Sequence, residues 1–161
     1  MTILLVTAPQ GREGDAILEL EWALGKVKVK GTDWRGVLLA ETPLPKEEAL
    51  ERLKGFETQA IQRVVPIDII VPAKKEEIER AVLKLAERID GTFAVRAKVR
   101  GNRELSQREL EIGLGSLIVD AFGLKVDLSD PDYTVAIEVL GKKAGIGLVK
   151  RGELLRLDVV E

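Results

Sequence analysis

Strand-like and helix-like segments alternate along the first part of the chain, and this alternation restricts the fold more than any other feature. A short apolar run at residues 3–7 is followed by apolar residues at helical spacing over residues 12–24. Alternating Val and Lys, a turn and a second apolar run indicate a hairpin over residues 27–41. A helix after Pro45 and a β-branched run at residues 61–71 complete the order βαββαβ. The sequence therefore predicts a mixed α/β (α+β) module.

A second series of elements begins after this module with the most regular helix of the sequence. Its apolar residues recur at i, i+3, i+4, i+7, i+8 and i+11, and they are Ile78, Ala81, Val82, Leu85, Ala86 and Ile89. The patterns that follow predict one strand, one helix and three more strands, at residues 93–100, 107–122, 133–140, 144–150 and 154–160. These elements predict a second α/β layer.

The two series are not separated by a flexible linker, an internal repeat or a low-complexity tract. The β-branched run at residues 61–71, which Pro66 interrupts, is expected to join two closely packed modules. We therefore expect a domain of residues 1–60, whose last strand can extend to about residue 72, followed by a domain of residues 61–161.

The chain has no cysteine and no histidine, which excludes disulfides, thiol nucleophiles, structural zinc and the usual catalytic triads. The one dense carboxylate cluster, Asp127, Asp130 and Asp132, lacks the Gly and distal Glu of a calcium loop and surrounds Pro131, which favours a turn. An acylphosphatase-like use of the first module is disfavoured because the single Asn, Asn102, lies in the second. We therefore expect a non-catalytic chain with no metal and no cofactor.

Composition also bears on the setting in which the chain works. Charged residues make up 32% of the chain, with one Asn and four Gln, a balance typical of proteins from hot environments. No apolar run approaches the roughly 18 to 20 residues of a membrane span, and residues 1–6 are too short and lack the basic start of a signal peptide. We expect a cytoplasmic protein with no membrane partner.

The positive charge of this slightly acidic chain is concentrated in one stretch. In the strand predicted at residues 93–100, period-two alternation places four apolar residues on one face and Arg96, Lys98 and Arg100 on the other, with the charges ~7 Å apart. The stretch from Arg96 to Arg108 contains five basic residues, among them Arg103, and one acidic residue. The spacing of these charges suits the phosphates of an RNA backbone. The net charge of −2 argues mildly against a nucleic-acid partner. The alternative is a solvated strand face whose charges pair with neighbouring Glu side chains.

The residues after this strand strengthen the prediction of an anion site. Ser106–Gln107–Arg108–Glu109 matches a capping box, which places the positive end of a helix beside the basic residues. Gly113 and Gly115 lie inside that helix and suit a close approach, either of an RNA backbone or of the facing sheet, and packing against the sheet is the expected reason for them. Gly145 and Gly147, in a later strand, suit either a close RNA backbone or a crowded, bent strand. Lys142 and Lys143 precede that strand and are expected to extend the basic patch.

The second module resembles the THUMP domain. The residues that carry the resemblance are the run 93–100, Gly101, Ser106, Glu109 and Gly113, followed by residues 126–128, 131–133 and 135–139. The run 64–67 and the helix at 74–89 are similar to the opening of that domain, so the resemblance covers residues 61–161. The first module, with residues 12–16 after its first strand, is similar to the ferredoxin-like domain that accompanies THUMP in many RNA-modifying proteins.

The resemblance implies a function. THUMP domains occur in thiouridine synthases, RNA methylases and pseudouridine synthases, where they hold the acceptor end of tRNA, including its 3′ CCA. The chain most resembles a stand-alone family that delivers tRNA to a separate RNA cytidine acetyltransferase, which implies a tRNA-binding adaptor for N4-acetylcytidine formation. The expected RNA-binding residues are Arg96, Lys98, Arg100, Arg103 and Arg108, with Lys142 and Lys143 in second rank. The alternative is a non-catalytic protein-interaction or small-ligand regulatory module with a ferredoxin-like sheet.

Overall fold

The computed structural model describes residues 1–153 and 155–156 and divides the chain into two compact units. Unit 1 comprises Met1–Pro66 together with the described residues from Gly152 onward, and unit 2 is Ile67–Arg151. This division follows packing alone. The evolutionary domain limits, 1–60 and 61–161, stay a prediction.

Unit 1 contains a five-stranded sheet and two helices, in the order β1 (Thr2–Thr7), α1 (Glu13–Leu24), β2 (Lys28–Gly31), β3 (Val37–Thr42), α2 (Lys46–Gly55) and β4 (Arg63–Ile67). The sheet order is β2-β3-β1-β4-β9, where β9 (Leu155–Arg156) pairs with β4. Strands β1 and β2 both run antiparallel to β3. The expected order βαββαβ is confirmed, because alternating and helical apolar spacings each direct one face of an element into a shared core.

A buried carboxylate closes the loop between α2 and β4. Glu19 on α1 is 7% exposed, and its two oxygens accept hydrogen bonds from the backbone N–H groups of Gln59, Ala60 and Ile61, at 2.6 to 3.2 Å. A buried loop would otherwise leave these donors unsatisfied. The residue is therefore structural, and its position between apolar neighbours in the sequence gives no hint of the distant loop that it holds.

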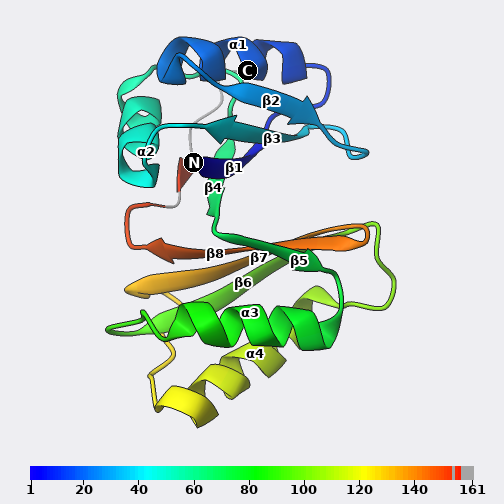
Figure 1. Cartoon of the computed structure of the whole chain (residues 1–161), viewed down its shortest axis with the longest axis vertical. Helices are drawn as coiled ribbons and strands as arrows, with labels where there is room; N and C mark the ends of the chain where they lie inside the picture. Colours follow the sequence, from blue (N-terminus) through cyan, green and yellow to red (C-terminus); the bar gives the residue numbers. More distant parts are fainter. Residues whose placement is uncertain (154, 157–161) are drawn as a thin grey trace. The chain divides into compact units, whose positions relative to one another are not determined.

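Unit 2 is a four-stranded sheet with two helices on one face (Figure 1). Its elements are β5 (Ile69–Pro72), α3 (Lys75–Ala86), β6 (Phe93–Arg100), α4 (Gln107–Phe122), β7 (Tyr133–Leu140) and β8 (Lys143–Lys150). The sheet order is β5-β8-β7-β6, in which β6 and β7 run parallel and the other neighbours antiparallel. Helix α4 connects the parallel pair, as such a crossover requires.

Strand β6 lies at the edge of this sheet and shows the expected two faces. Phe93, Val95 and Ala97 are buried against the helices, while Arg96 and Lys98 are exposed. The outer side of the strand is partly covered, because Phe93 exchanges backbone hydrogen bonds with residues 125–127 and the N–H of Ala97 donates to Oε2 of Glu111 at 2.9 Å. These contacts satisfy backbone groups that an open edge would expose.

One expectation about the strands is wrong, and one falls mostly outside the described residues. The run at residues 61–71 was expected to be interrupted at Pro66, but Pro66 lies within β4 and the break falls at Asp68, whose carboxylate accepts the N–H of Leu148 at 2.7 Å. The break allows β4 and β5 to join different sheets. Of the strand expected at 154–160, β9 covers two residues, and the others lie outside the described part of the chain. Among the described residues, no helix is long and apolar enough to cross a bilayer.

Candidate RNA-binding surface

Two loops that are distant in sequence are hydrogen-bonded to each other at one end of the unit 2 sheet. The N–H of Gly141, in the β7–β8 turn, donates to the carbonyl of Arg100 at 2.8 Å. Asn102, in the β6–α4 loop, donates from Nδ2 to the carbonyl of Gly141 at 3.0 Å. Its Oδ1 accepts the N–H groups of Glu104 and Leu105, at 2.9 and 3.2 Å. Asn102 therefore both shapes its own loop and ties it to the turn.

A third segment reaches the same place. The N–H of Ala73, after β5, donates to the carbonyl of Lys142 at 2.8 Å. Lys74 is the N-cap residue of α3 and makes no side-chain cap, so the first amides of that helix lack the partner that Ser or Asp would give. The N-terminal end of a helix carries partial positive charge, which adds to the charge of the lysine.

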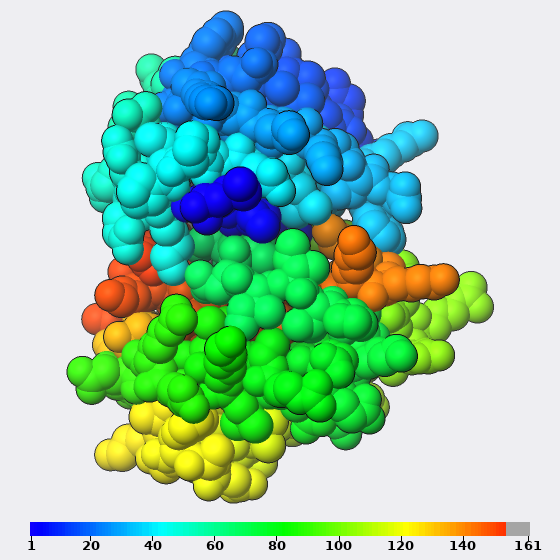
Figure 2. Space-filling model, viewed as in Figure 1, coloured from blue at the N-terminus to red at the C-terminus, as the bar shows by residue number. Residues whose placement is uncertain are grey.

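We call the resulting cluster the basic end of unit 2, and it consists of Lys74, Arg100, Arg103, Lys142 and Lys143. Figure 1 shows the β6–α4 loop and the β7–β8 turn next to each other, and Figure 2 shows the same segments, in yellow-green and orange, projecting from the surface. The structure thus brings together four of the seven residues that the sequence predicted to contact RNA.

The cations of the basic end are available to a ligand. Lys74, Arg103, Lys142 and Lys143 are exposed, and within the described residues none of them forms an ion pair. Arg100 is half-buried, and its Nη1 atom is buried with no hydrogen-bond partner among the described residues. A guanidinium nitrogen without a partner is energetically costly, so an acceptor near this arginine would stabilise the site.

The other three predicted residues lie apart from the basic end or are engaged elsewhere. Arg96 donates from Nη2 to the carbonyl of Leu128 at 2.6 Å, so it supports the loop after α4. Lys98 is exposed and lies in register with Glu138, a buried carboxylate on β7. Arg108 is exposed in the first turn of α4. Lys98 and Arg108 extend the charge of the basic end along the strand and onto the helix.

The start of α4 shows half of the predicted capping box. Oγ of Ser106 accepts the N–H of Glu109 at 3.3 Å, as expected. Within the described residues, the N–H of Ser106 does not donate the reciprocal bond to the Glu109 carboxylate. The Glu109 carboxylate instead lines a groove between α3 and α4.

The four glycines noted in the sequence are not all explained by close packing. A Cβ atom at Gly113 or Gly115 would meet nothing within 4 Å, so the expectation that these glycines pack against the fold is wrong. Each costs about 1 kcal/mol relative to Ala in a helix, with no compensating contact inside unit 2. At Gly145 a Cβ atom would lie 3.1 Å from Cγ2 of Ile67, so the crowded strand, one of the two open explanations, accounts for that glycine.

The carboxylates around Pro131 shape a turn, as expected. Asp127 accepts the N–H groups of Ser129 and Asp130, and these bonds lower its pKa. The pKa of Asp132 is lowered first by the backbone N–H of Thr92 and then by the Thr92 hydroxyl, and Asp132 also pairs with Arg151 at 2.9 Å. Within the described residues, no group of three acidic side chains is arranged to hold a metal ion.

The sequence analysis missed two residues of this surface. Gly101–Asn102–Arg103 was expected to turn the chain, as Asn commonly bonds the backbone two residues further on, but the bond of Asn102 to Gly141 was not expected. Lys74 was treated as the opening of a helix. The local sequence around Asn102 and Lys74 does not predict the contact between loops some 40 residues apart. That contact arises from the parallel pairing of β6 with β7.

Comparison with known proteins places this surface in a recognised domain. The THUMP domain model matches residues 72–149, which contain every residue of the basic end. A probable tRNA sulfurtransferase of Aeropyrum pernix is 26% identical over 129 residues, covering 79% of this chain and 33% of that protein. The crystal structure of TrmN from Thermus thermophilus has a TM-score of 0.69 at 22% identity, covering 92% of this chain and 45% of that one. A 4-thiouridine synthetase in complex with RNA and ATP has a TM-score of 0.64 at 21% identity, covering 98% and 42%.

These matches correct one expectation. The prediction of a non-catalytic accessory chain is contradicted, because a relative similar in sequence is named as a probable tRNA sulfurtransferase and a protein with the same fold as a 4-thiouridine synthetase, and both are enzymes. That prediction rested on the lack of His and Cys in this chain. The chain spans about a third of the length of the curated relatives it matches, 31% and 33% of the first two.

The fold of unit 2, the family model and the tRNA-related relatives agree with the resemblance carried by the basic strand and the helix that follows it. Residues 72–149 of the chain match the THUMP domain model.

Proposed function

We propose that this chain binds tRNA through the basic end of unit 2 and takes part in tRNA modification. The observation that carries the proposal is the hydrogen-bonded pair of loops that gathers Arg100, Arg103, Lys142 and Lys143 inside the THUMP domain. Phosphate contacts from clustered Lys and Arg supply most of the affinity of such surfaces and fix the register of the RNA.

We propose the acceptor stem and the 3′ CCA end as the bound part of tRNA. Lys98 and Arg100 follow each other on one face of β6 with ~7 Å between them, a spacing that suits successive phosphates of an extended strand. The free helix start at Lys74 offers backbone N–H groups to a phosphate at the same place. Aromatic residues are sparse, so binding rests on phosphates more than on base stacking.

The test compares the full chain with a double charge reversal, Arg100→Glu with Arg103→Glu. We expect a loss of tRNA affinity of roughly tenfold or more and a salt slope smaller by about two, because two phosphate contacts are removed. The matched control is Lys84→Glu with Arg88→Glu, which makes the same charge change at exposed residues beyond the middle of α3. Equal binding by both double variants would reject the basic end as the RNA surface.

Removing the 3′ CCA from the same tRNA tests the choice of site on the RNA. We expect weaker binding of the truncated tRNA by the wild-type chain and a much smaller difference for the Arg100→Glu, Arg103→Glu variant. If truncation has the same effect on both proteins, the CCA end is not held at the basic end.

We propose that the tRNA modification is thiolation, in place of the cytidine acetylation expected from the sequence. The reason is that the curated relative matched over 129 residues is a probable tRNA sulfurtransferase. Mass spectrometry of nucleosides in tRNA from a deletion strain separates the two. Loss of a thiolated nucleoside supports this proposal, and loss of N4-acetylcytidine with thiolation intact overturns it in favour of acetylation.

A further inference from the structure

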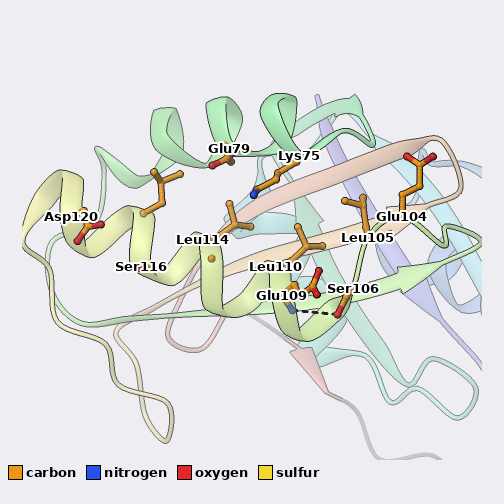
Figure 3. A pocket seen from close by; sticks show the side chains of 12 residues that line it. Lys75, Glu79, Glu104, Leu105, Ser106, Glu109, Leu110, Leu114, Ser116 and Asp120 are labelled. Atoms are coloured by element: carbon orange, nitrogen blue, oxygen red, sulfur yellow. Dashed lines mark hydrogen bonds between the residues drawn. The ribbon is translucent and has the colours of Figure 1, made fainter.

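A groove of about 430 Å³ lies between α3 and α4, on the helical side of unit 2 (Figure 3). Its apolar floor is formed by Leu105, Leu110, Leu114 and Leu117. Leu110 and Leu114 belong to the core, and Leu105 and Leu117 are half-buried and pack against it. The groove therefore offers leucine surface to any molecule that enters it.

The rim of this groove is acidic. Glu79, Glu104, Glu109 and Asp120 line it, against a single cation, Lys75. Within the described residues, none of the four carboxylates has a hydrogen-bond or ion-pair partner. Other acidic side chains of the molecule do pair, as Glu77 does with Arg80 at 2.9 Å. Four unpaired carboxylates around one opening attract a cationic ligand and repel a polyanion.

The surface of α4 is open at this groove. Gly113 lines it, and a Cβ atom there would meet nothing within 4 Å. Nothing within unit 2 therefore fills the space above this turn of the helix. A side chain of a docked molecule can approach the α4 backbone here more closely than at any turn that carries a long residue.

We propose that this helix groove docks a segment of a protein partner that carries both apolar and basic side chains. Apolar side chains contact the leucine floor, and Lys or Arg side chains pair with the carboxylates of the rim, in the manner of an amphipathic helix in a groove. The charge of the rim excludes RNA as the occupant, so the groove is functionally distinct from the basic end. The inference does not depend on the proposed tRNA binding.

The probe for this proposal is a fluorescein-labelled amphipathic peptide of Leu and Lys, compared by anisotropy with a peptide in which Glu replaces Lys. Two kinds of variant separate the contributions of charge and shape. Glu79→Lys with Asp120→Lys reverses two charges of the rim, and its control, Glu76→Lys with Glu87→Lys, makes the same change at exposed residues outside the groove. Gly113→Leu obstructs the groove, and Gly115→Leu is its control, because Gly115 is equally open but lines a different cavity.

We expect the Lys peptide to bind the wild-type chain and the Glu peptide not to bind. Binding of the Lys peptide should fall at least about tenfold for the rim variant and for Gly113→Leu, and less than about twofold for the two controls, since loss of close charge pairs or of the apolar contact weakens an interface by such factors. Circular dichroism checks that every variant is folded. An equal loss in a variant and its control would overturn the proposal.

Two further measurements exclude other occupants. If Gly113→Leu loses tRNA affinity relative to Gly115→Leu, the groove is an RNA surface and the proposal is overturned. If sedimentation shows that the wild-type chain self-associates and that Gly113→Leu is monomeric, the occupant is a second copy of this chain, which also overturns it. Failure of tRNA binding with the peptide results intact would remove the proposed function and leave this inference standing.

Discussion

One of the two hydrogen bonds between the two basic loops comes from the side chain of Asn102, and replacing Asn102 by Ala removes it. Ala at this position eliminates three hydrogen bonds, one to the carbonyl of Gly141 and two from the N–H groups of Glu104 and Leu105. A net contribution of about 0.5 to 1.5 kcal/mol for each bond gives about 1.5 to 4.5 kcal/mol. Because Glu104 is exposed and water can replace its bond, we expect a loss near the lower end, about 2 kcal/mol.

Urea denaturation of the full chain measures this loss, and thermal unfolding should show a Tm lower by about 4 to 8 °C. Asn102→Asp is the companion variant, because a carboxylate keeps both acceptor bonds but cannot donate to Gly141. We expect it to be destabilised by the loss of that one bond and by repulsion between its oxygen and the carbonyl. A loss below about 0.5 kcal/mol for Asn102→Ala would refute the reasoning.

The same variant tests whether the loops must be held together for RNA binding. Asn102→Ala leaves every charge of the basic end in place but removes the side-chain hydrogen bond between the loop of Arg103 and the turn of Lys142. We expect tRNA affinity to fall by roughly threefold to tenfold, because the cations must then be ordered on binding. Unchanged affinity would mean that the cations act without a fixed arrangement.

Three other predictions follow from the contacts of single residues. Glu19→Ala leaves three backbone N–H groups without their acceptor, so we expect unit 1 to lose about 3 to 5 kcal/mol in urea denaturation, and a loss under about 1 kcal/mol would contradict this. Gly113→Ala should raise the stability of the chain by about 1 kcal/mol, because the new methyl group meets nothing, and a lower Tm would contradict it. The pKa of Asp132 is lowered in the folded chain, so its carboxylate stabilises the fold above its ordinary pKa of about 3.9, and this stabilisation is lost as the pH falls through the lowered value. The free energy of unfolding of Asp132→Asn should therefore fall less between pH 6 and pH 2 than that of the wild-type chain, as denaturation at each pH would measure.

Much of unit 2 could be predicted because its patterns are long and regular. The bounds expected for β6, α4 and β7 are those observed, since each element keeps one apolar periodicity from end to end and a Gly or a Ser marks its limit. The break between β4 and β5 was misplaced because Pro66 is the stronger local signal. The observed break at Asp68 depends on an acceptor for Leu148, 80 residues away.

The candidate site was predictable in part for the same reason. Local patterning identified Arg100, Arg103 and the lysine pair as cationic, but their meeting depends on tertiary hydrogen bonds between a loop and a turn. The engagement of Arg96 by the carbonyl of Leu128 could not be foreseen, because that loop has no regular pattern. The acidic groove was also invisible in the sequence, since its carboxylates come from two helices and a loop.

The pairing of β4 with β9 gives the chain an order of assembly. Strand β4 ends where unit 2 begins, and β9 follows the end of unit 2, so the two strands of one antiparallel pair flank the whole THUMP-containing unit. All of unit 2 is therefore synthesised before β9. Unit 2 is the connection between β4 and β9. Once unit 2 has folded, the entropy cost of bringing these two strands together falls to that of closing a short loop. Slow or failed folding of unit 2 should then leave the sheet of unit 1 with an open edge at β4.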